Sequence, residues 1–234
     1  MYNSANTLVP ILKKYQSNFA PISDIPLTDD YLYVMDLTEN NASLSQEIIR
    51  HSNKLESYIE ARLLIERKSI AVGGYLEKRV LYQRSPLFDT VASEHRNIHL
   101  GIDLWTLAGT TVQAPLSGKI IGLKDNNNFA DYGPTIILEH NLDDVKFYSL
   151  YGHLSRKSLQ DKRIGDRIGK GKAFCTIGNY PENGDWSPHL HFQLMTDMLG
   201  HEHDFPGTCS AKDKTYYAMI CPDPNLILGL ACLK

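Results

Sequence analysis

The stretch that most constrains the fold is a succession of short runs between residues 98 and 195, in which apolar and polar residues alternate. Alternation with a period of two is typical of strands that bury one face, and Gly, Pro, Asn and Asp turns separate these runs. No long helical pattern intervenes, so the runs favour an antiparallel sheet or sandwich over a parallel α/β fold. The predicted strands cover residues 99–105, 118–124, 135–140, 145–154, 173–179 and 189–195.

The first 85 residues follow a different pattern. Apolar residues at helical spacing predict a short helix over residues 6–16 and a long helix over residues 40–67, capped by Ser43 or Ser45, and a strand is expected at residues 31–37. We therefore expect an α/β N-terminal region with a docking or regulatory role, a mainly β domain, and a C-terminal extension that packs on this domain and ends in a short helix. The predicted boundaries are 1–85, 86–200 and 201–234.

Composition narrows the classes of partner and compartment. The 234 residues carry a net charge of −3, which gives no basic surface, so we expect neither nucleic acid nor a membrane as partner. The N-terminus lacks the pattern of a signal peptide, and no run approaches the ~18 apolar residues of a membrane span. The four cysteines show no CxxC spacing and are expected to be reduced thiols. We therefore expect a cytoplasmic protein, with non-classical export left open.

The run "SPHLHFQL" raises a chemical question, because His189, His191 and Gln193 share one face of the predicted strand while the apolar residues share the other. The run "HLGIDL" similarly places His99 and Asp103 on one face. On a straight strand these two residues would lie about 13 Å apart, too far to bind one metal ion. A shared ion would therefore require a bend near Gly101, which glycine permits.

A fourth histidine, His153, lies near the end of the predicted strand at residues 145–154. Four histidines and one aspartate thus lie at or near strand ends. Zinc suits such a set, because it binds imidazole nitrogen and carboxylate oxygen, and because a catalytic site needs three protein ligands and one open position. Cysteine is absent from the three motifs, which argues against a structural thiolate site.

These motifs resemble the lysostaphin-type (LytM-like) zinc metallopeptidases, whose signature is HxxxD, an isolated His and HxH in this order. The similarity runs from about residue 95 to residue 195 and includes the turns "GTTVQAPLSGKI" and "GDRIGKGKAFCTIG". It implies a mainly β, two-sheet antiparallel catalytic domain of the duplicated hybrid motif type. It also implies a zinc-dependent endopeptidase, whose usual substrates are peptides of peptidoglycan.

The resemblance also assigns roles to individual residues. It implies that His99, Asp103 and His191 bind one zinc ion per chain. It implies that His153 and His189 stay off the metal and act on the water and the scissile carbonyl, because the motif lacks the glutamate base of HExxH enzymes. The expected partner is a peptide or amide substrate, which can be peptidoglycan-derived.

Two features separate this chain from secreted members of that family. Many of them have a tyrosine several residues before the first ligand, whereas residues 93–98 read "SEHRNI", and Tyr151, His95 or Arg96 are candidate substitutes. Segments such as "VGGYLEKRVLYQRSPLF" and "CPDPNLILG" resemble the peptidase-like segment of bacterial polypeptides that join a kinase-like domain to an aminotransferase domain. That resemblance implies a cytosolic substrate.

Two other functions stay open at this point. The chain could be a non-catalytic metal-binding regulatory module, or a phosphocarrier like the glucose-type protein of the sugar phosphotransferase system, whose HFGIDT stretch is similar to "HLGIDL". The HxH motif has no place in that carrier. The N-terminal region could also inhibit the site through a polar side chain, such as Asn40, Asn41 or Asn97, although a docking role is the simpler prediction.

Overall fold

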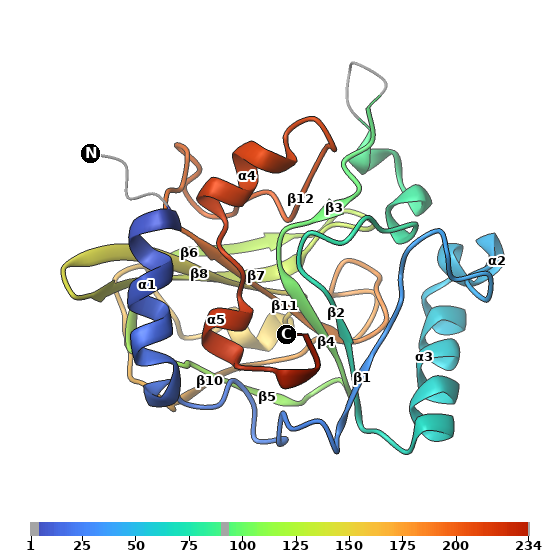
Figure 1. The fold of residues 1–234 in the computed structure, drawn as a ribbon, viewed down its shortest axis with the longest axis horizontal. Coiled ribbons are helices and arrows are strands. Elements are labelled where there is room, and N and C mark those ends of the chain that lie inside the picture. Colours follow the sequence, from blue (N-terminus) through green and yellow to red (C-terminus); the bar gives the residue numbers. More distant parts are fainter. Residues whose placement is uncertain (1–4, 90–93, 234) are drawn as a thin grey trace.

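A single large sheet organises the computed structural model, which describes residues 5–89 and 94–233 (Figure 1). The α-helices are α1 (Ala5–Tyr15), α2 (Gln46–Arg50), α3 (Ser52–Glu66), α4 (Lys214–Ile220) and α5 (Asn225–Leu228). The strands are β1 (Leu32–Val34), β2 (Ile70–Gly73), β3 (Ile98–His99), β4 (Ile102–Trp105), β5 (Thr111–Gln113), β6 (Gly118–Asn126), β7 (Gly133–Leu142), β8 (Val145–Gly152), β9 (Arg167–Ile168), β10 (Ala173–Thr176), β11 (His189–Met195) and β12 (Thr208–Cys209). Residues 1–4, in the predicted N-terminal region, 90–93, in the predicted β domain, and 234, at the end of the predicted C-terminal extension, lie outside the described residues.

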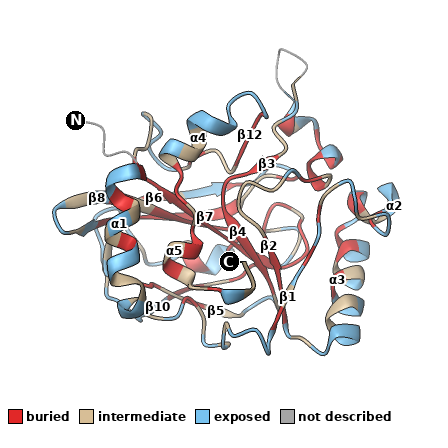
Figure 2. Ribbon diagram, in the orientation of Figure 1, coloured by how far each residue is buried: buried red, intermediate tan, exposed pale blue. Residues whose placement is uncertain are grey.

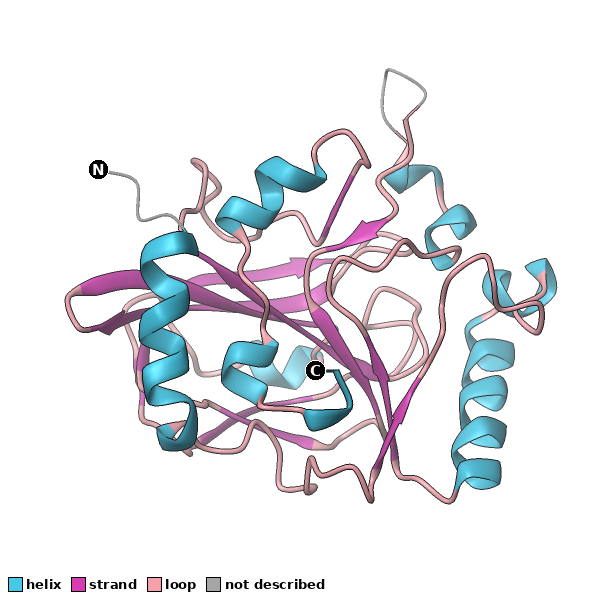
Figure 3. Cartoon of the chain, in the orientation of Figure 1, coloured by secondary structure: helices cyan, strands magenta, loops and turns pink. Residues whose placement is uncertain are grey.

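The strand order of the large sheet is β1-β2-β4-β11-β8-β7-β6-β9, and all pairs in it are antiparallel except β1 with β2. Two smaller antiparallel pairs, β10 with β5 and β12 with β3, complete the strands (Figure 3). The predicted mainly β, antiparallel fold is therefore confirmed. In the centre of the sheet, His191 of β11 lies opposite Asp103 of β4 on one side and Gly152 of β8 on the other.

The main hydrophobic core lies on one face of this sheet. It joins Phe192 of β11 to Val112 of β5 and to Leu8 and Leu12 of α1, all buried. Figure 2 shows the buried residues concentrated in the central strands, with exposed residues on the outer sides of the helices. This packing explains the alternation of apolar and polar residues in the sequence. The apolar residues of the strands pack into this core or into a smaller cluster on the opposite side of the sheet, which contains Ile137, Leu150 and Met195.

The N-terminal region is built into the same sheet. Strand β2 pairs with β4, so the sheet continues across the predicted boundary near residue 85, which itself stays a prediction. The α2–α3 segment packs against the end of the sheet formed by β1, β2 and β4, where Leu55 and Ile59 of α3 share a buried cluster with Trp105 of β4. Two 3-10 turns, Leu81–Arg84 and Pro86–Phe88, belong to the same cluster and line the site described below.

The single long helix predicted over residues 40–67 is wrong, because the segment forms two helices, α2 and α3. Ser45, one of the two predicted capping residues, caps α2, because its side chain accepts a hydrogen bond from the Ile48 N–H. His51 then adopts an extended conformation (φ −121°, ψ 119°), which ends α2 and starts α3. The C-terminal extension likewise holds two helices, α4 and α5, where a single short terminal helix was predicted.

The four cysteines, Cys175, Cys209, Cys221 and Cys232, are free thiols, as predicted. Among the helices of residues 5–89 and 94–233, none combines the length and apolar character needed to cross a bilayer.

Candidate metal centre

The segment from His99 to Asp103 is bent, as a shared metal site requires. Strand β3 ends at His99 and β4 begins at Ile102, so Leu100 and Gly101 interrupt the strand. The bend brings His99 Nε2 to 3.2 Å from Asp103 Oδ1. Glycine is needed here for space, since a Cβ at residue 101 would lie 2.7 Å from His191 Cε1.

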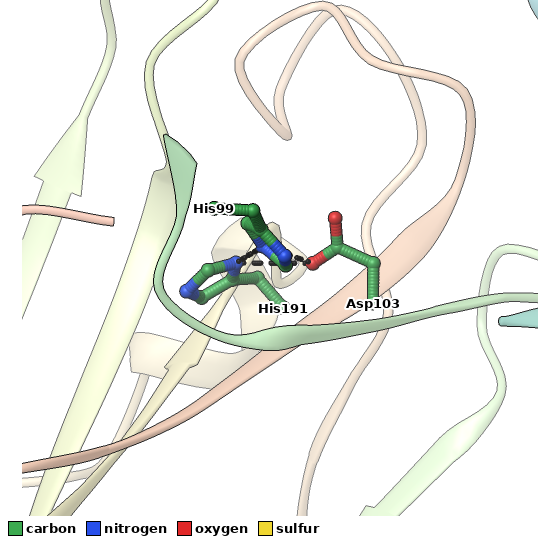
Figure 4. A group of neighbouring side chains, drawn as sticks. All are labelled: His99, Asp103 and His191. Atoms are coloured by element: carbon green, nitrogen blue, oxygen red, sulfur yellow. Dashed lines mark hydrogen bonds and ion pairs between the residues drawn. The ribbon is translucent and has the colours of Figure 1, made fainter. Parts of the chain in front are cut away.

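Three side chains converge at this bend (Figure 4). His191 Nδ1 lies 2.9 Å from His99 Nε2 and 3.0 Å from Asp103 Oδ1. A tetrahedral zinc site with bonds near 2.05 Å has ligand–ligand separations of about 3.3 Å, so the three atoms already stand close to the required spacing. All three residues are buried. Two imidazoles and a carboxylate at this spacing fit a zinc ion.

Hydrogen bonds fix which ring nitrogen of each histidine faces the centre. The His99 Nδ1–H donates to the carbonyl of Gly74 at 3.0 Å, which leaves Nε2 unprotonated toward the centre. His191 is turned the other way, because its Nε2–H donates to Gln193 Oε1 at 2.9 Å and leaves Nδ1 for a metal. The Gln193 amide is itself held by Pro206 O at 3.1 Å. Such partners orient metal-binding imidazoles and select their tautomer.

Asp103 is held from the side opposite the histidines. Its Oδ2 forms an ion pair with the guanidinium of Arg79, which is buried and also lies 2.8 Å from Glu77 Oε2. Burial by itself would raise the pKa of Asp103, but the neighbouring His99 imidazole and Arg79 guanidinium hold that pKa well below its ordinary value. Burial, assisted by Arg79, lowers the pKa of His99 to about 3. An ionised carboxylate and a neutral imidazole are the forms that bind metal.

His153 and His189 form a second pair beside the centre. Their ring centroids are 4.1 Å apart, and each donates its Nδ1–H to a backbone carbonyl, of Asn183 at 2.8 Å and of Ser187 at 2.7 Å. Each Nε2 is therefore left unprotonated. Burial lowers the pKa of His189 to about 4, and it also lowers that of His153.

The backbone and the distances support a separate role for this pair. His153 has φ +60°, a conformation that non-glycine residues seldom adopt and that clusters at functional sites. His189 Nε2 lies 3.9 Å from Asp103 Oδ2, farther than the ligand atoms lie from one another. The structure thus brings all five predicted site residues together. Their division into three ligands and two catalytic residues stays a prediction.

A pocket of about 240 Å³ opens over the centre. Asp103, His153, His189 and His191 lie in its wall, together with Tyr132, whose ring centroid is 5.6 Å from that of His153 and 5.2 Å from that of His191. Sequence reasoning did not identify Tyr132, Arg79 or Gln193 as site residues. For Gln193 a signal existed, because it shares the strand face of the two histidines.

The candidates for a substitute tyrosine lie in different places. Tyr151 is fully buried in the main core against Phe174, away from the pocket, and His95 pairs with Asp89 at the surface. Arg96 does line the pocket. None of the polar residues considered for inhibition, Asn40, Asn41 and Asn97, is among the described residues that line it.

Comparison with known sequences finds a family model that covers this centre. Residues 97–203 match the sequence model of peptidase family M23, and all five predicted site residues lie within the match. The predicted resemblance to lysostaphin-type peptidases is thereby confirmed, whereas that to kinase–aminotransferase polypeptides stays a prediction. No curated protein sequence matches the chain.

Several solved structures are similar to parts of the chain. The catalytic domain of the antimicrobial peptidase lysostaphin from Staphylococcus simulans is 28% identical, with a TM-score of 0.36, over 52% of this chain and 80% of that one. A Pseudomonas aeruginosa chain assigned to peptidase M23 is 23% identical (TM-score 0.38) over 56% of this chain and 44% of that one. A zinc-containing peptidase from Vibrio cholerae is 23% identical (TM-score 0.34) over 52% and 35%. The chain therefore spans less than half the length of the last two proteins.

Proposed function

We propose that residues 97–203, which match the sequence model of peptidase family M23, hydrolyse peptide or amide bonds with one zinc ion bound by His99, Asp103 and His191. The observation that carries the proposal is the convergence of His99 Nε2, Asp103 Oδ1 and His191 Nδ1 to within 3.2 Å of one another at the wall of a pocket. A bound zinc ion would supply a Lewis acid that activates water and polarises an amide carbonyl.

The protein's own groups account for the proton transfers. His153 and His189 are neutral, and their Nδ1–H groups are occupied by backbone carbonyls. Either Nε2 can therefore accept a proton from the attacking water and deliver it to the leaving amine. Once protonated, the same imidazole stabilises negative charge that develops on the carbonyl oxygen.

A phosphocarrier fits the geometry less well. A histidine that receives a phosphoryl group from another protein must be accessible, whereas His99 is 1% exposed and its Nε2 faces Asp103 and His191. A phosphoryl group at this nitrogen would also be placed against the Asp103 carboxylate. A regulatory module without activity remains the second candidate, and catalysis is the property that separates it from a peptidase.

The test is hydrolysis by metal-depleted protein before and after zinc is restored, on purified peptidoglycan and separately on a mixture of short soluble peptides. We expect zinc-dependent cleavage that falls about 10²–10⁴-fold in His189→Ala or His153→Ala while zinc content is kept. Zinc binding without any hydrolysis would favour the regulatory module. Release of muropeptides by wild type and not by His153→Ala would identify peptidoglycan as the substrate and contradict the predicted cytosolic substrate.

A further inference from the structure

The pocket over the metal centre has one apolar wall. The 3-10 turns that follow β2 contribute Tyr82, Leu87 and Phe88, and the loop before β11 contributes Trp186. The rings form a continuous cluster, with centroids 4.6 Å apart for Tyr82 and Phe88, and 6.5 Å apart for Phe88 and Trp186. These residues belong to neither the ligand set nor the catalytic pair.

Trp186 joins this wall to the catalytic histidines. Its ring centroid lies 6.2 Å from that of His153 and 6.4 Å from that of His189. Its indole N–H donates to Asp131 O at 3.1 Å, so its one polar atom is satisfied and the ring presents apolar surface. The buried Arg84 guanidinium lies 4.5 Å from the Trp186 centroid and helps to fix the ring.

A wall of this kind has a consequence for the substrate. A glycine on either side of the scissile bond would leave the rings without contact, whereas each methylene buried against them is worth roughly a fourfold gain in affinity. The pocket volume of about 240 Å³ lies below the roughly 300–1,000 Å³ of pockets for drug-sized ligands, so the pocket has room for a single apolar side chain. Building on the proposed function, we propose that the substrate carries an aromatic or bulky apolar group beside the amide that is cleaved.

Binding of two small thiols to zinc-loaded protein tests this preference without relying on turnover. A thiol binds zinc through one atom, as a thiolate whose proton passes to the buffer, so its substituent can turn toward either side of the centre. Calorimetry would compare benzyl mercaptan with ethanethiol. We expect benzyl mercaptan to bind at least about tenfold more tightly, because only its ring can reach the apolar wall.

Matched variants locate the effect. Leu87→Ala removes a half-buried wall residue and should lower the benzyl-to-ethyl affinity ratio about fivefold. Leu107→Ala makes the same change at a residue that is 75% exposed and outside the pocket lining, and it should leave the ratio unchanged. Phe88→Leu, which keeps the side chain apolar and the fold intact, should also lower the ratio.

The outcomes separate the two proposals. Equal affinities for the two thiols in wild type, or an equal loss in Leu87→Ala and Leu107→Ala, would overturn the apolar subsite while the zinc peptidase proposal stands. Failure of both thiols to bind the zinc-loaded protein would likewise overturn the subsite while zinc binding stands. Failure of the protein to retain zinc would overturn the metal centre and with it the subsite.

Discussion

Replacing Arg79 by methionine removes the positive charge that holds Asp103. The Arg79 side chain is 1% exposed, pairs with Asp103 Oδ2, and lies 5.6 Å from the ring centroid of Trp105. Methionine keeps an unbranched apolar stem beside Trp105, so the change acts mainly on charge. It leaves the Asp103 carboxylate buried with one oxygen unpaired.

The expected cost follows from this burial. Breaking a buried ion pair by removing one partner costs about 3–5 kcal/mol, because the remaining charge stays desolvated. The His99 and His191 nitrogens that face Asp103 Oδ1 are unprotonated and donate no hydrogen bond to it, so we expect a cost within this range, at least about 3 kcal/mol, in metal-free protein. Added zinc should recover part of this difference, since it supplies positive charge to the same carboxylate.

Urea unfolding of metal-free wild type and Arg79→Met measures this difference. Lys54→Met is the matched control, because Lys54 pairs with Glu47 at the surface, where the side chains are 43% and 70% exposed. An exposed pair contributes at most about 1 kcal/mol, so this variant should unfold almost like wild type. If Arg79→Met also lost less than about 1 kcal/mol, the structural role assigned to Arg79 would be refuted.

Three further predictions concern other parts of the chain. Gly101→Ala should weaken zinc binding at least about tenfold in a chelator competition, because its Cβ would displace His191. Gly169→Ala, whose added Cβ would meet only Lys172 Cγ at an ordinary contact distance of 3.4 Å, should not. Burial lowers the pKa of His140 to about 4, so between pH 6.5 and pH 4 the unfolded chain binds a proton that the folded chain does not. Between pH 7 and pH 4 the free energy of unfolding in urea should therefore fall by about 3 kcal/mol more for wild type than for His140→Gln, and equal decreases in the two proteins would contradict this. Deleting residues 1–85 removes β1, β2 and Leu12 of the main core, so circular dichroism should show an unfolded protein; a folded fragment with higher activity would support inhibition instead.

The strands were predictable because their pattern is local. Alternation of residues such as Leu190 and Phe192 with His189 and His191 specifies which side chains face the core, without knowledge of any other strand. The bend at Gly101 was predictable for a different reason, since a straight strand cannot bring His99 and Asp103 to one ion. The pairing of two distant motifs, by contrast, rested on the family resemblance.

The failures share a dependence on tertiary structure. The break at His51 follows no helix-breaking residue, and periodicity alone carries the pattern through it. Arg79 lies 24 positions before Asp103 in a region that looked separate, and it reaches the carboxylate because β2 pairs with β4. Tyr132 lies between the strands predicted at residues 118–124 and 135–140, where no periodic pattern marks it, yet the fold turns its ring against His153. No periodic pattern reports such contacts.

The zinc content of purified His191→Ala, compared with that of His189→Ala, tests the central claim most directly. The two residues lie two positions apart on the same strand face, but only His191 Nδ1 stands within 3.0 Å of both His99 Nε2 and Asp103 Oδ1. Elemental analysis should find about one zinc per chain in wild type and in His189→Ala, and almost none in His191→Ala. Equal zinc loss in the two variants, or a wild-type protein that binds no zinc, would contradict the assignment of the metal centre.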